Sequence, residues 1–447
     1  MTLSSTVVWE VRVSGSDVNG GAYKSDAGTV DYSLQDAAQL AVTDAVTNGT
    51  TTITSATGGF TDAMVGNLIY ITGGTGSIAA ERYEIATRSD TNTITVDRST
   101  GLTTGTGATL NVGGALGSPG ELSAAISTQG VADMKAWAKS GAYALTTATL
   151  NVSGGAPDFS AGSMNNKRFY LSGYQTTRGD LAAQPSITAG AFAPVQMTKM
   201  GGSSGGSHLL RNFSLDGGSQ NVNGIMSGSN LYNRVTHCLV SHCDGTNAFS
   251  TIQCMKCKAF SCAASGFQSG ANWGCWADAC VTGFSMGGGL PQTNCIASNN
   301  TGDGFAGNSA PLVGCTSYNN SGDGFQVSTS NRGTYLANCV TYGNGGYSYN
   351  GMTTADLSNC ASSNTDTSGR FNQTPFFDID GIALTADPFT NAAGGDFSLN
   401  TDAGGGALLR AAGINPFGQT GFLDAGAVQH EDAGGGGGGG SNFILGG

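Results

Sequence analysis

The sequence predicts an all-β protein, a right-handed parallel β-helix solenoid with about twenty residues in each coil, preceded by an N-terminal cap and β domain. The first observation is a motif that recurs through the middle of the chain at intervals of 18 to 24 residues. The second is the composition, in which only 11% of residues are charged and 73 of 447 are glycine. Globular proteins usually carry about 25% charged residues and about 7% glycine. Low charge and many glycines suit short strands joined by tight turns.

The repeat is clearest in residues 295–305 and 315–325, which read CIASNNTGDGF and CTSYNNSGDGF. Weaker copies of this frame also begin with cysteine, at Cys238, Cys257, Cys275, Cys339 and Cys360. They end with an aromatic residue, at Phe249, Phe267, Phe284, Tyr349 and Phe371. In a solenoid, equivalent residues of neighbouring coils lie about 4.8 Å apart. We therefore expect one cysteine row and one aromatic row to be stacked inside the coils.

A second row follows each opening cysteine by five residues. Its members are small or polar: Cys243, Cys262, Cys280, Asn300, Asn320, Asn344 and Thr365. Asparagine tolerates left-handed backbone geometry and can bond to its equivalents above and below, so this row predicts a shared turn position. A leucine-rich repeat has a similar period, but leucine is too sparse here and the glycines and asparagines break any helical pattern.

The runs Asn300–Phe305 and Asn320–Phe325 resemble the parallel β-helix repeat family, the pectate-lyase-like superfamily. The resemblance is strong over 201–371, and the segment 387–428 is similar to the closing coils of such proteins. It implies a β-helix fold and, through similarity to phage tail spikes and fibres, a homotrimer. The Trp-Ile-Asp-His run of pectate lyases and the paired Asp-Asp of polygalacturonases are missing, so the known active sites of this fold do not carry over.

The rest of the chain divides into three segments around the β-helix of residues 119–432. Residues 1–45 form the cap, with a strand over Val7–Val13 and a helix over Ser33–Val42, where Ser33 is the N-cap. Residues 46–118 form a small β-rich domain or insertion. Its expected strands are 51–55, 67–72, 82–88, 93–97 and 109–112. Residues 433–447 are a glycine-rich tail, expected to contact a neighbouring subunit through the apolar 443–445.

Charge and hydropathy exclude several partners. The net charge is −12, and phosphate binding needs a basic surface, so no nucleic-acid partner is expected. No run approaches the roughly 18 apolar residues of a membrane helix, so no membrane insertion is expected. Residues 1–13 lack the basic and apolar regions of a cleavable signal peptide. Together with the extracellular type of composition, this predicts a virion or extracellular location, reached by lysis or non-classical secretion.

The sharpest catalytic candidates are Asp303 and Asp323, one coil apart. Their carboxylates could approach to about 5 Å, the separation found in retaining glycosidases. The simpler interpretation, which we favour, is that each is chosen for the Gly-Asp-Gly turn. Ca²⁺ is a candidate ligand of these carboxylates and the adjacent asparagines; no other cofactor is expected.

Two further groups of residues suggest chemistry. Cys254 and Cys257 have the spacing of zinc ligands, and other cysteines and histidines lie nearby in sequence, although a buried cysteine row is favoured. Trp273 and Trp276 flank Cys275, a spacing that could place one side chain inside the coil and one outside. An outward tryptophan would suit stacking on a sugar, but packing is the favoured role for both.

The sequence therefore predicts a structural or adhesive component of a virion or extracellular assembly, similar to a phage tail spike or fibre. Glycan binding to a cell-surface polysaccharide is a candidate activity. We expect a homo-oligomer, either a trimer or a filament. The missing acid–base constellation favours a non-enzymatic role. A polysaccharide-degrading lyase or hydrolase is the first alternative, and a secreted bacterial adhesin or self-assembling filament subunit is the second.

Overall fold

The structure of the chain is a computed structural model. The residues that it describes are 3–145, 150–151, 168–189, 196–200, 207–227, 233–327, 334–351, 356–363, 377–378, 381–410, 412–413 and 424–428, apart from gaps of one to three residues inside those ranges. The chain forms two compact units, 1–214 and 215–447. The predicted parallel β-helix is confirmed, with about seven turns of about 21 residues each and an N-terminal β domain.

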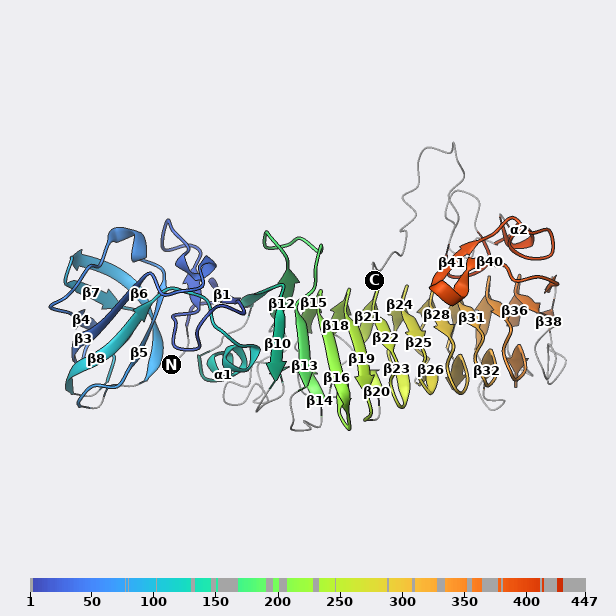
Figure 1. Cartoon of the computed structure of the whole chain (residues 1–447), viewed down its shortest axis with the longest axis horizontal. Coiled ribbons are helices and arrows are strands. Elements are labelled where there is room, and N and C mark those ends of the chain that lie inside the picture. Colours follow the sequence, from blue (N-terminus) through green and yellow to red (C-terminus); the bar gives the residue numbers. More distant parts are fainter. Residues whose placement is uncertain are drawn as a thin grey trace. The chain divides into compact units, whose positions relative to one another are not determined.

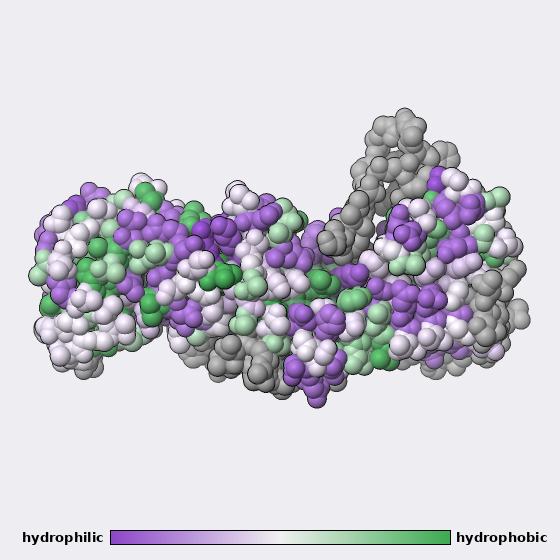
Figure 2. Space-filling model, viewed as in Figure 1, coloured by the Kyte–Doolittle hydropathy of each residue, from purple (hydrophilic) through white to green (hydrophobic). Residues whose placement is uncertain are grey.

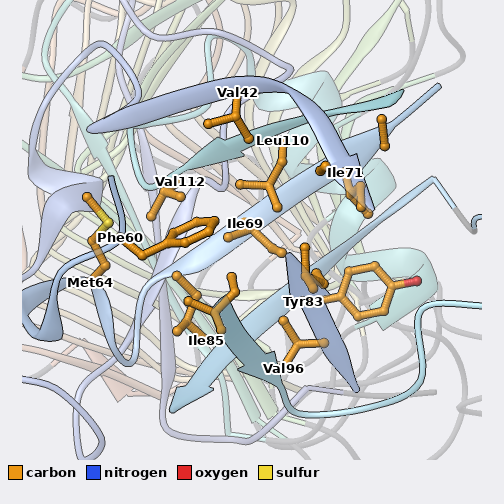
Figure 3. Packing of buried hydrophobic residues seen from close by; sticks show 14 residues of the cluster. Val42, Phe60, Met64, Ile69, Ile71, Tyr83, Ile85, Val96, Leu110 and Val112 are labelled. Atoms are coloured by element: carbon orange, nitrogen blue, oxygen red, sulfur yellow. The ribbon is translucent and has the colours of Figure 1, made fainter. Parts of the chain in front are cut away.

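Within unit 1, six antiparallel strands close into a barrel in the order β3-β4-β7-β6-β5-β8. The strands are β3 (Leu40–Asn48), β4 (Thr52–Thr54), β5 (Leu68–Thr72), β6 (Glu81–Asp90), β7 (Thr93–Val96) and β8 (Thr104–Val112). Five of them were predicted, and β3 begins inside the segment expected to be a cap. Inward residues of the strands, such as Ile69 and Tyr83, meet Phe60 from the segment between β4 and β5 in one apolar core (Figure 3). A turn of 3₁₀ helix, Asp62–Met64, closes one side.

The predicted helix over Ser33–Val42 is wrong. Asp31 caps a single 3₁₀ turn, Tyr32–Leu34, by accepting a hydrogen bond from the Ser33 N–H. From Leu40 onward the chain is the extended strand β3, whose buried residues are Val42, Ala45 and Thr47, with register shifts between them. The predicted N-cap is also wrong, because Asp31 caps the turn and Ser33 lies inside it.

An α-helix instead occupies α1 (Pro119–Gln129), where the first coils of the β-helix were expected. The Ser118 hydroxyl accepts a hydrogen bond from the Glu121 N–H at 3.1 Å, and Pro119 is the first helical residue. Ser-Pro-x-Glu is a recognised helix start that the sequence offered. Neither α1 nor the short α2 (Gly406–Leu409), the two α-helices in the described part of the chain, has the length and apolar content needed to cross a membrane.

Parallel coils begin within unit 1. The predicted N-terminal strand is confirmed as β1 (Val7–Val11), which pairs antiparallel with β2 (Ala22–Lys24) and parallel with β9 (Lys135–Lys139). Parallel pairing continues from β9 to β12 (Arg168–Tyr174) and from β12 to β15 (Ser207–Arg211). The other two sides are formed by β10 (Ala142–Leu145) with β13 (Ser186–Ala189), and β11 (Leu150–Asn151) with β14 (Gln196–Met200).

Unit 2 consists of coils whose strands stack into three parallel sheets (Figure 1). Sheet 1 contains β18 (Arg234–Thr236), β21 (Gln253–Met255), β24 (Asn272–Trp273), β27 (Gln292–Thr293), β30 (Leu312–Val313), β33 (Tyr335–Ala337), β36 (Asp356–Ser358) and β38 (Phe377–Asp378). Sheet 2 contains β16 (Ser214–Gln220), β19 (Leu239–Cys243), β22 (Lys258–Phe260), β25 (Trp276–Asp278), β28 (Ile296–Ser298), β31 (Thr316–Tyr318), β34 (Val340–Tyr342), β37 (Ala361–Ser363) and β39 (Ile382–Leu384). Sheet 3 contains β17 (Asn223–Ser227), β20 (Asn247–Ser250), β23 (Ser265–Gln268), β26 (Thr282–Met286), β29 (Phe305–Gly307), β32 (Phe325–Val327) and β35 (Tyr349–Asn350).

The stacked rows predicted from the repeat line the interior of these coils. Phe305 pairs with Phe325 across β29 and β32, and their rings stack at 4.9 Å. The complete aromatic row has ring separations of 4.7 to 5.5 Å and consists of Phe249, Phe267, Phe284, Phe305, Phe325 and Tyr349. The predicted Phe371 lies outside the described residues. All eleven cysteines are buried and remain thiols.

The asparagine row is confirmed as a ladder of side-chain hydrogen bonds, but the left-handed backbone lies one residue earlier, at Asn299 (φ +54°) and Asn319 (φ +51°). The Asn300 side-chain amide donates to Asn320 Oδ1 at 2.7 Å, and the Asn320 amide donates to Asn344 Oδ1 at 3.0 Å. All three residues are buried. The hydrogen bonds between amides of neighbouring coils replace the hydrogen bonds to water that these groups lose on burial. The predicted last member, Thr365, and the whole tail 433–447 lie outside the described residues.

The segment expected to form closing coils does something different. Strands β40 (Phe389–Asn391) and β41 (Asp396–Leu399) pair antiparallel, joined by the 3₁₀ turn Ala392–Gly394, and are followed by α2. These elements lie against the outer face of sheet 2 (Figure 1). Together with 424–428 they are called the strap, which comprises the described residues 387–410 and 424–428. The strap buries outward apolar side chains of sheet 2, including Ile296, Val340 and Ala361. A further coil could not cover this apolar stripe. Its burial explains why the chain packs back onto sheet 2 instead of adding another coil.

Candidate functional site

Asp303 and Asp323 lie one coil apart, as predicted, and both carboxylates serve the stacking of turns. Asp303 Oδ1 accepts the Asp323 backbone N–H at 2.8 Å, and Asp323 Oδ1 accepts the Tyr347 backbone N–H at 2.7 Å. Asn350 donates to the other Asp323 oxygen. Burial raises the pKa of the Asp303 carboxyl, and the charge of Asp323 adds to the rise. This geometry supports the turn interpretation; catalysis and Ca²⁺ binding at the pair stay predictions.

The zinc hypothesis finds no cluster of ligands. Among the described residues, no group of three or more cysteine, histidine, aspartate or glutamate side chains is placed to hold a metal ion. Cys254 and Cys257 are buried, and the Cys257 thiol donates to the backbone carbonyl of Val235 at 3.4 Å. Burial, helped by the neighbouring Cys257, raises the pKa of the Cys254 thiol, which disfavours the thiolate that zinc requires.

The two tryptophans both point away from the coil interior, so the arrangement with one inward side chain is not the one found. Trp273 ends a strand of sheet 1, Gly274 turns the chain with φ +56°, and Trp276 begins a strand of sheet 2. The left-handed corner breaks the alternation of side chains that a single strand would impose. Cys275, between them, takes the inward position.

Trp276 lies beneath the strap and has a packing role. Its ring contacts Phe397 edge-on with centroids 5.7 Å apart, and its Nε1 donates to the Ser298 hydroxyl at 2.8 Å. The Lys258 ammonium lies over the Trp276 ring, 3.5 Å from the ring centroid. These contacts fix the side chain to the protein itself and leave Trp273 as the tryptophan of this coil with a face available to a ligand.

Trp273 lines a groove with a volume of about 450 Å³ in unit 2. The groove runs over the outward row of sheet 1, where Thr236, Met255, Trp273 and Thr293 occupy neighbouring rungs. Met255 is 46% exposed. The strap supplies Ala427 and Val428 on the opposite wall. The strap is held there by a bond from the Ala427 N–H to the Thr316 hydroxyl at 3.0 Å.

The polar part of the groove consists of side chains that can bond to hydroxyl or anionic groups. They are Arg234, Thr236, Gln253, Lys256, Thr293 and Asn294. Their placement follows from register, because Arg234 pairs with Gln253 and Thr236 with Met255 on adjacent strands. An apolar platform surrounded by a few convergent polar groups is the usual form of a small-molecule or saccharide site.

The sequence analysis named Trp273 but missed Arg234, Lys256 and the strap. The strap wall could not be foreseen, because Val428 meets Ile296 only after a return of more than a hundred residues. A signal for Lys256 was present, however. It precedes an opening cysteine, at the position that is glycine or asparagine in most other coils.

The chain is similar to several solved structures over part of its length. The A-module of the Azotobacter vinelandii mannuronan C-5 epimerase AlgE4 is 14% identical, with a TM-score of 0.39 over 59% of this chain and 76% of that one. The pectate lyase Pel9A is 14% identical, with a TM-score of 0.40 over 69% of this chain and 90% of that one. ORF18 of Geobacillus virus E2 is 12% identical, with a TM-score of 0.30 over 56% and 53% of the two chains.

The predicted parallel β-helix architecture is confirmed by the stacked parallel sheets of the chain itself. No protein-family model matches the sequence, and a search of curated proteins finds no significant match. Similarity at this level concerns the path of the backbone and gives no residue roles. The class defined by the fold and the groove is a parallel β-helix protein with an aromatic site on its outer surface, and its activity has to be argued from that site.

Proposed function

We propose that this chain is a carbohydrate-binding structural or adhesive component of a virion or extracellular assembly, and that it binds glycan in the groove of sheet 1. The observation that carries the proposal is Trp273, a half-buried tryptophan on an outward row of stacked strands. A large apolar side chain kept at the surface beside hydroxyl and amide groups indicates a binding site.

The chemistry of the groove fits a sugar. The C–H groups on one face of a pyranose ring are apolar and can lie on an indole ring, while its hydroxyls need hydrogen-bond partners around the edge. Met255 extends the apolar platform by one rung, and Thr236, Gln253 and Thr293 supply side-chain donors and acceptors. Successive rungs repeat about every 4.8 Å, so a linear glycan running along the stack would meet such groups repeatedly.

The assembly role is supported by the architecture and the composition. Coils that share ladders of aromatic rings and asparagine amides form a stack in which each turn supports the next. The low charge and the high content of glycine and polar residues are typical of extracellular surface proteins. In this proposal the chain acts as a homo-oligomer, a trimer or a filament, and its groove contacts a cell-surface polysaccharide. Size measurement of the purified full chain by light scattering tests the oligomer.

The glycan-binding proposal is tested on an array of bacterial surface polysaccharides with the full chain and two variants. Trp273→Ala should abolish or strongly weaken binding of any glycan that the native chain captures, and Trp273→Phe, which keeps an aromatic face, should retain part of it. Binding that is unchanged in Trp273→Ala would refute the groove as the site.

Depolymerisation is a separate proposal with a separate test. Incubation with a captured polysaccharide, followed by measurement of new reducing ends or unsaturated uronates, detects it. Loss of such activity in both Asp303→Asn and Asp323→Asn, with native unfolding temperatures, would make the chain an enzyme and assign the carboxylates. Product formation unaffected by both substitutions would remove Asp303 and Asp323 as candidates.

A further inference from the structure

The charge of the groove is opposite to that of the protein. The chain carries 30 aspartates and glutamates against 18 lysines and arginines, a net charge of −12. Two charged residues, Arg234 and Lys256, are among those that line the groove, and both are cationic. No aspartate or glutamate of the described part of the chain lines it. A local excess of positive charge on an acidic protein raises the local concentration of anions and orients them.

Neither cation forms an ion pair within the part of the chain that the structure describes. Among the ion pairs formed between described residues, none involves Arg234 or Lys256. Some other basic residues are paired, such as Arg82 with Glu121 and Arg178 with Glu10, whereas Lys135, like the two groove cations, forms no ion pair with a described residue. What distinguishes Arg234 and Lys256 is that they line the groove and have no ion-pair partner among the described residues.

The backbone of Lys256 gives an independent indication. Lys256 has φ +52° at the corner between sheets 1 and 2, a left-handed geometry that lysine seldom adopts. The same corner in the other coils has φ between 51° and 62° and holds His237, Gly274, Asn294, Gly314, Asn338 and Asn359. Glycine, asparagine and histidine tolerate this geometry better than lysine does. The second corner row admits Ser261 and Ala279, so the strain alone assigns nothing, but here it falls on a groove residue.

The two cations and Trp273 lie on three consecutive rungs. The Lys256 backbone N–H donates to the Trp273 carbonyl at 2.9 Å, which places them on neighbouring coils. Arg234 pairs with Gln253 on the next strand in the opposite direction. The coils of Arg234 and Trp273 are thus separated by two rungs, roughly 10 Å at about 4.8 Å for each rung. A chain-like ligand lying along the stack would meet the aromatic ring and both charges.

We propose that the groove selects acidic glycans, with Lys256 and Arg234 bound to carboxylate or sulfate groups of a polysaccharide whose sugar face lies on Trp273. The inference rests on the proposed function and adds the class of glycan and the residues that select it. In this assignment Lys256 is kept at a strained corner because an ammonium is needed there. Asparagine would fit the corner better and would not bind the anion.

The test measures binding of polygalacturonate, dextran sulfate and uncharged dextran to the full chain at low and high salt. The native chain should prefer the acidic probes, and its affinity for them should fall with salt. Lys256→Asn and Arg234→Gln should each weaken acidic-probe binding by about tenfold or more, as expected for loss of a charge-assisted hydrogen bond. Lys256→Asn should also unfold at the same or a higher temperature than the native chain. Lys135→Gln, which removes an exposed lysine outside the groove, is the matched control and should bind normally.

The outcomes separate the two proposals. Preference for polygalacturonate or for dextran sulfate identifies the anion, and either supports the inference. Binding of dextran that is equal in strength, independent of salt and lost in Trp273→Ala would overturn the selection of acidic glycans and leave the proposed function intact. Normal acidic-probe binding by both Lys256→Asn and Arg234→Gln would overturn it as well. Failure of every glycan probe and of the polysaccharide array would refute the proposed function, and this inference with it.

Discussion

The outer faces of sheet 1 and sheet 2 belong to the same coils but differ in their surroundings: the strap packs on sheet 2, and a groove runs over sheet 1. On sheet 2 the outward apolar row is covered by the strap, which packs Phe389, Phe397 and Leu399 against it. On sheet 1, Trp273 and Met255 of the outward row line a groove with hydroxyl, amide and cationic groups. Figure 2 shows that hydrophilic residues are frequent on the visible surface of the strap, so covering sheet 2 also replaces an apolar surface by a polar one.

This difference separates packing from function in residues that look alike in the sequence. Trp273 and Trp276 are three positions apart, and each ends or begins a strand beside a left-handed corner. Trp276 has protein partners on its ring face, its ring edge and its N–H. The strap covers Trp276, whereas Trp273 faces the groove. This contrast is the reason to regard the exposure of Trp273 as functional.

The interior that both faces share gives the largest expected effect. Phe305 is fully buried between Phe284 and Phe325 in the aromatic row. Phe305→Ala should lower the free energy of unfolding by about 3–5 kcal/mol, since it leaves a cavity between two stacked rings. Urea denaturation of the full chain measures this, and Phe305→Leu, which keeps most of the volume, should lose less. A loss below about 1 kcal/mol in Phe305→Ala would mean that the stacked interior is not the common support of the two faces.

The comparison itself is sharpened by the matched pair Trp276→Ala and Trp273→Ala. Trp276→Ala should cost about 2–3 kcal/mol, because it removes the contact with the strap and the cation–π contact with Lys258. Trp273→Ala should change the unfolding free energy by no more than about 0.5 kcal/mol, as for a surface residue, while removing glycan binding. If both variants lost the same stability, the two faces would not differ in the way described, and Trp273 would be a packing residue.

The sequence predicted best what depends on periodicity. The phenylalanine and asparagine rows were predicted because like residues must stack when coils repeat every 20 or so positions. The barrel strands followed from alternation of apolar and polar residues, as in Ile69 and Ile71. In both cases the physical constraint acts between residues that are neighbours in the repeat or in the strand, so its trace lies in the sequence.

What could not be predicted depends on the return of distant segments. Nothing in the local sequence of the strap predicts that it packs on sheet 2, since the apolar stripe that it covers is spread over separate coils such as those of Ile296 and Val340. The groove wall formed by Val428 has the same origin. The candidate pair Asp303 and Asp323 was placed correctly, but its hydrogen bonds to the next turn required the structure. Lys256 occupies a repeat position that is glycine or asparagine in most other coils. This exception is visible in the sequence and was overlooked.

The smallest expected effect concerns Asp303, which lies on the sheet 3 side of the coils, away from the two outer faces. It tests whether the stacking of turns alone explains this residue. Burial and the charge of Asp323 raise the pKa of the Asp303 carboxyl, so the folded state binds this proton more tightly than the unfolded state. The stabilising contribution of the protonated form is therefore present below the ordinary aspartate pKa and is lost as the pH rises through the raised folded value.

Asp303→Asn keeps an oxygen that can accept the Asp323 N–H and cannot titrate. The unfolding free energy of the native chain, minus that of Asp303→Asn, should fall as the pH rises from about 4 toward neutrality. Urea denaturation across this range measures it, with an exposed-site control, Asp62→Asn, expected to show no such fall. A difference that rises with pH would show that the ionised form is favoured at this site, as in a bound cation or an unrecognised ion pair, and would reopen the Ca²⁺ prediction for the pair.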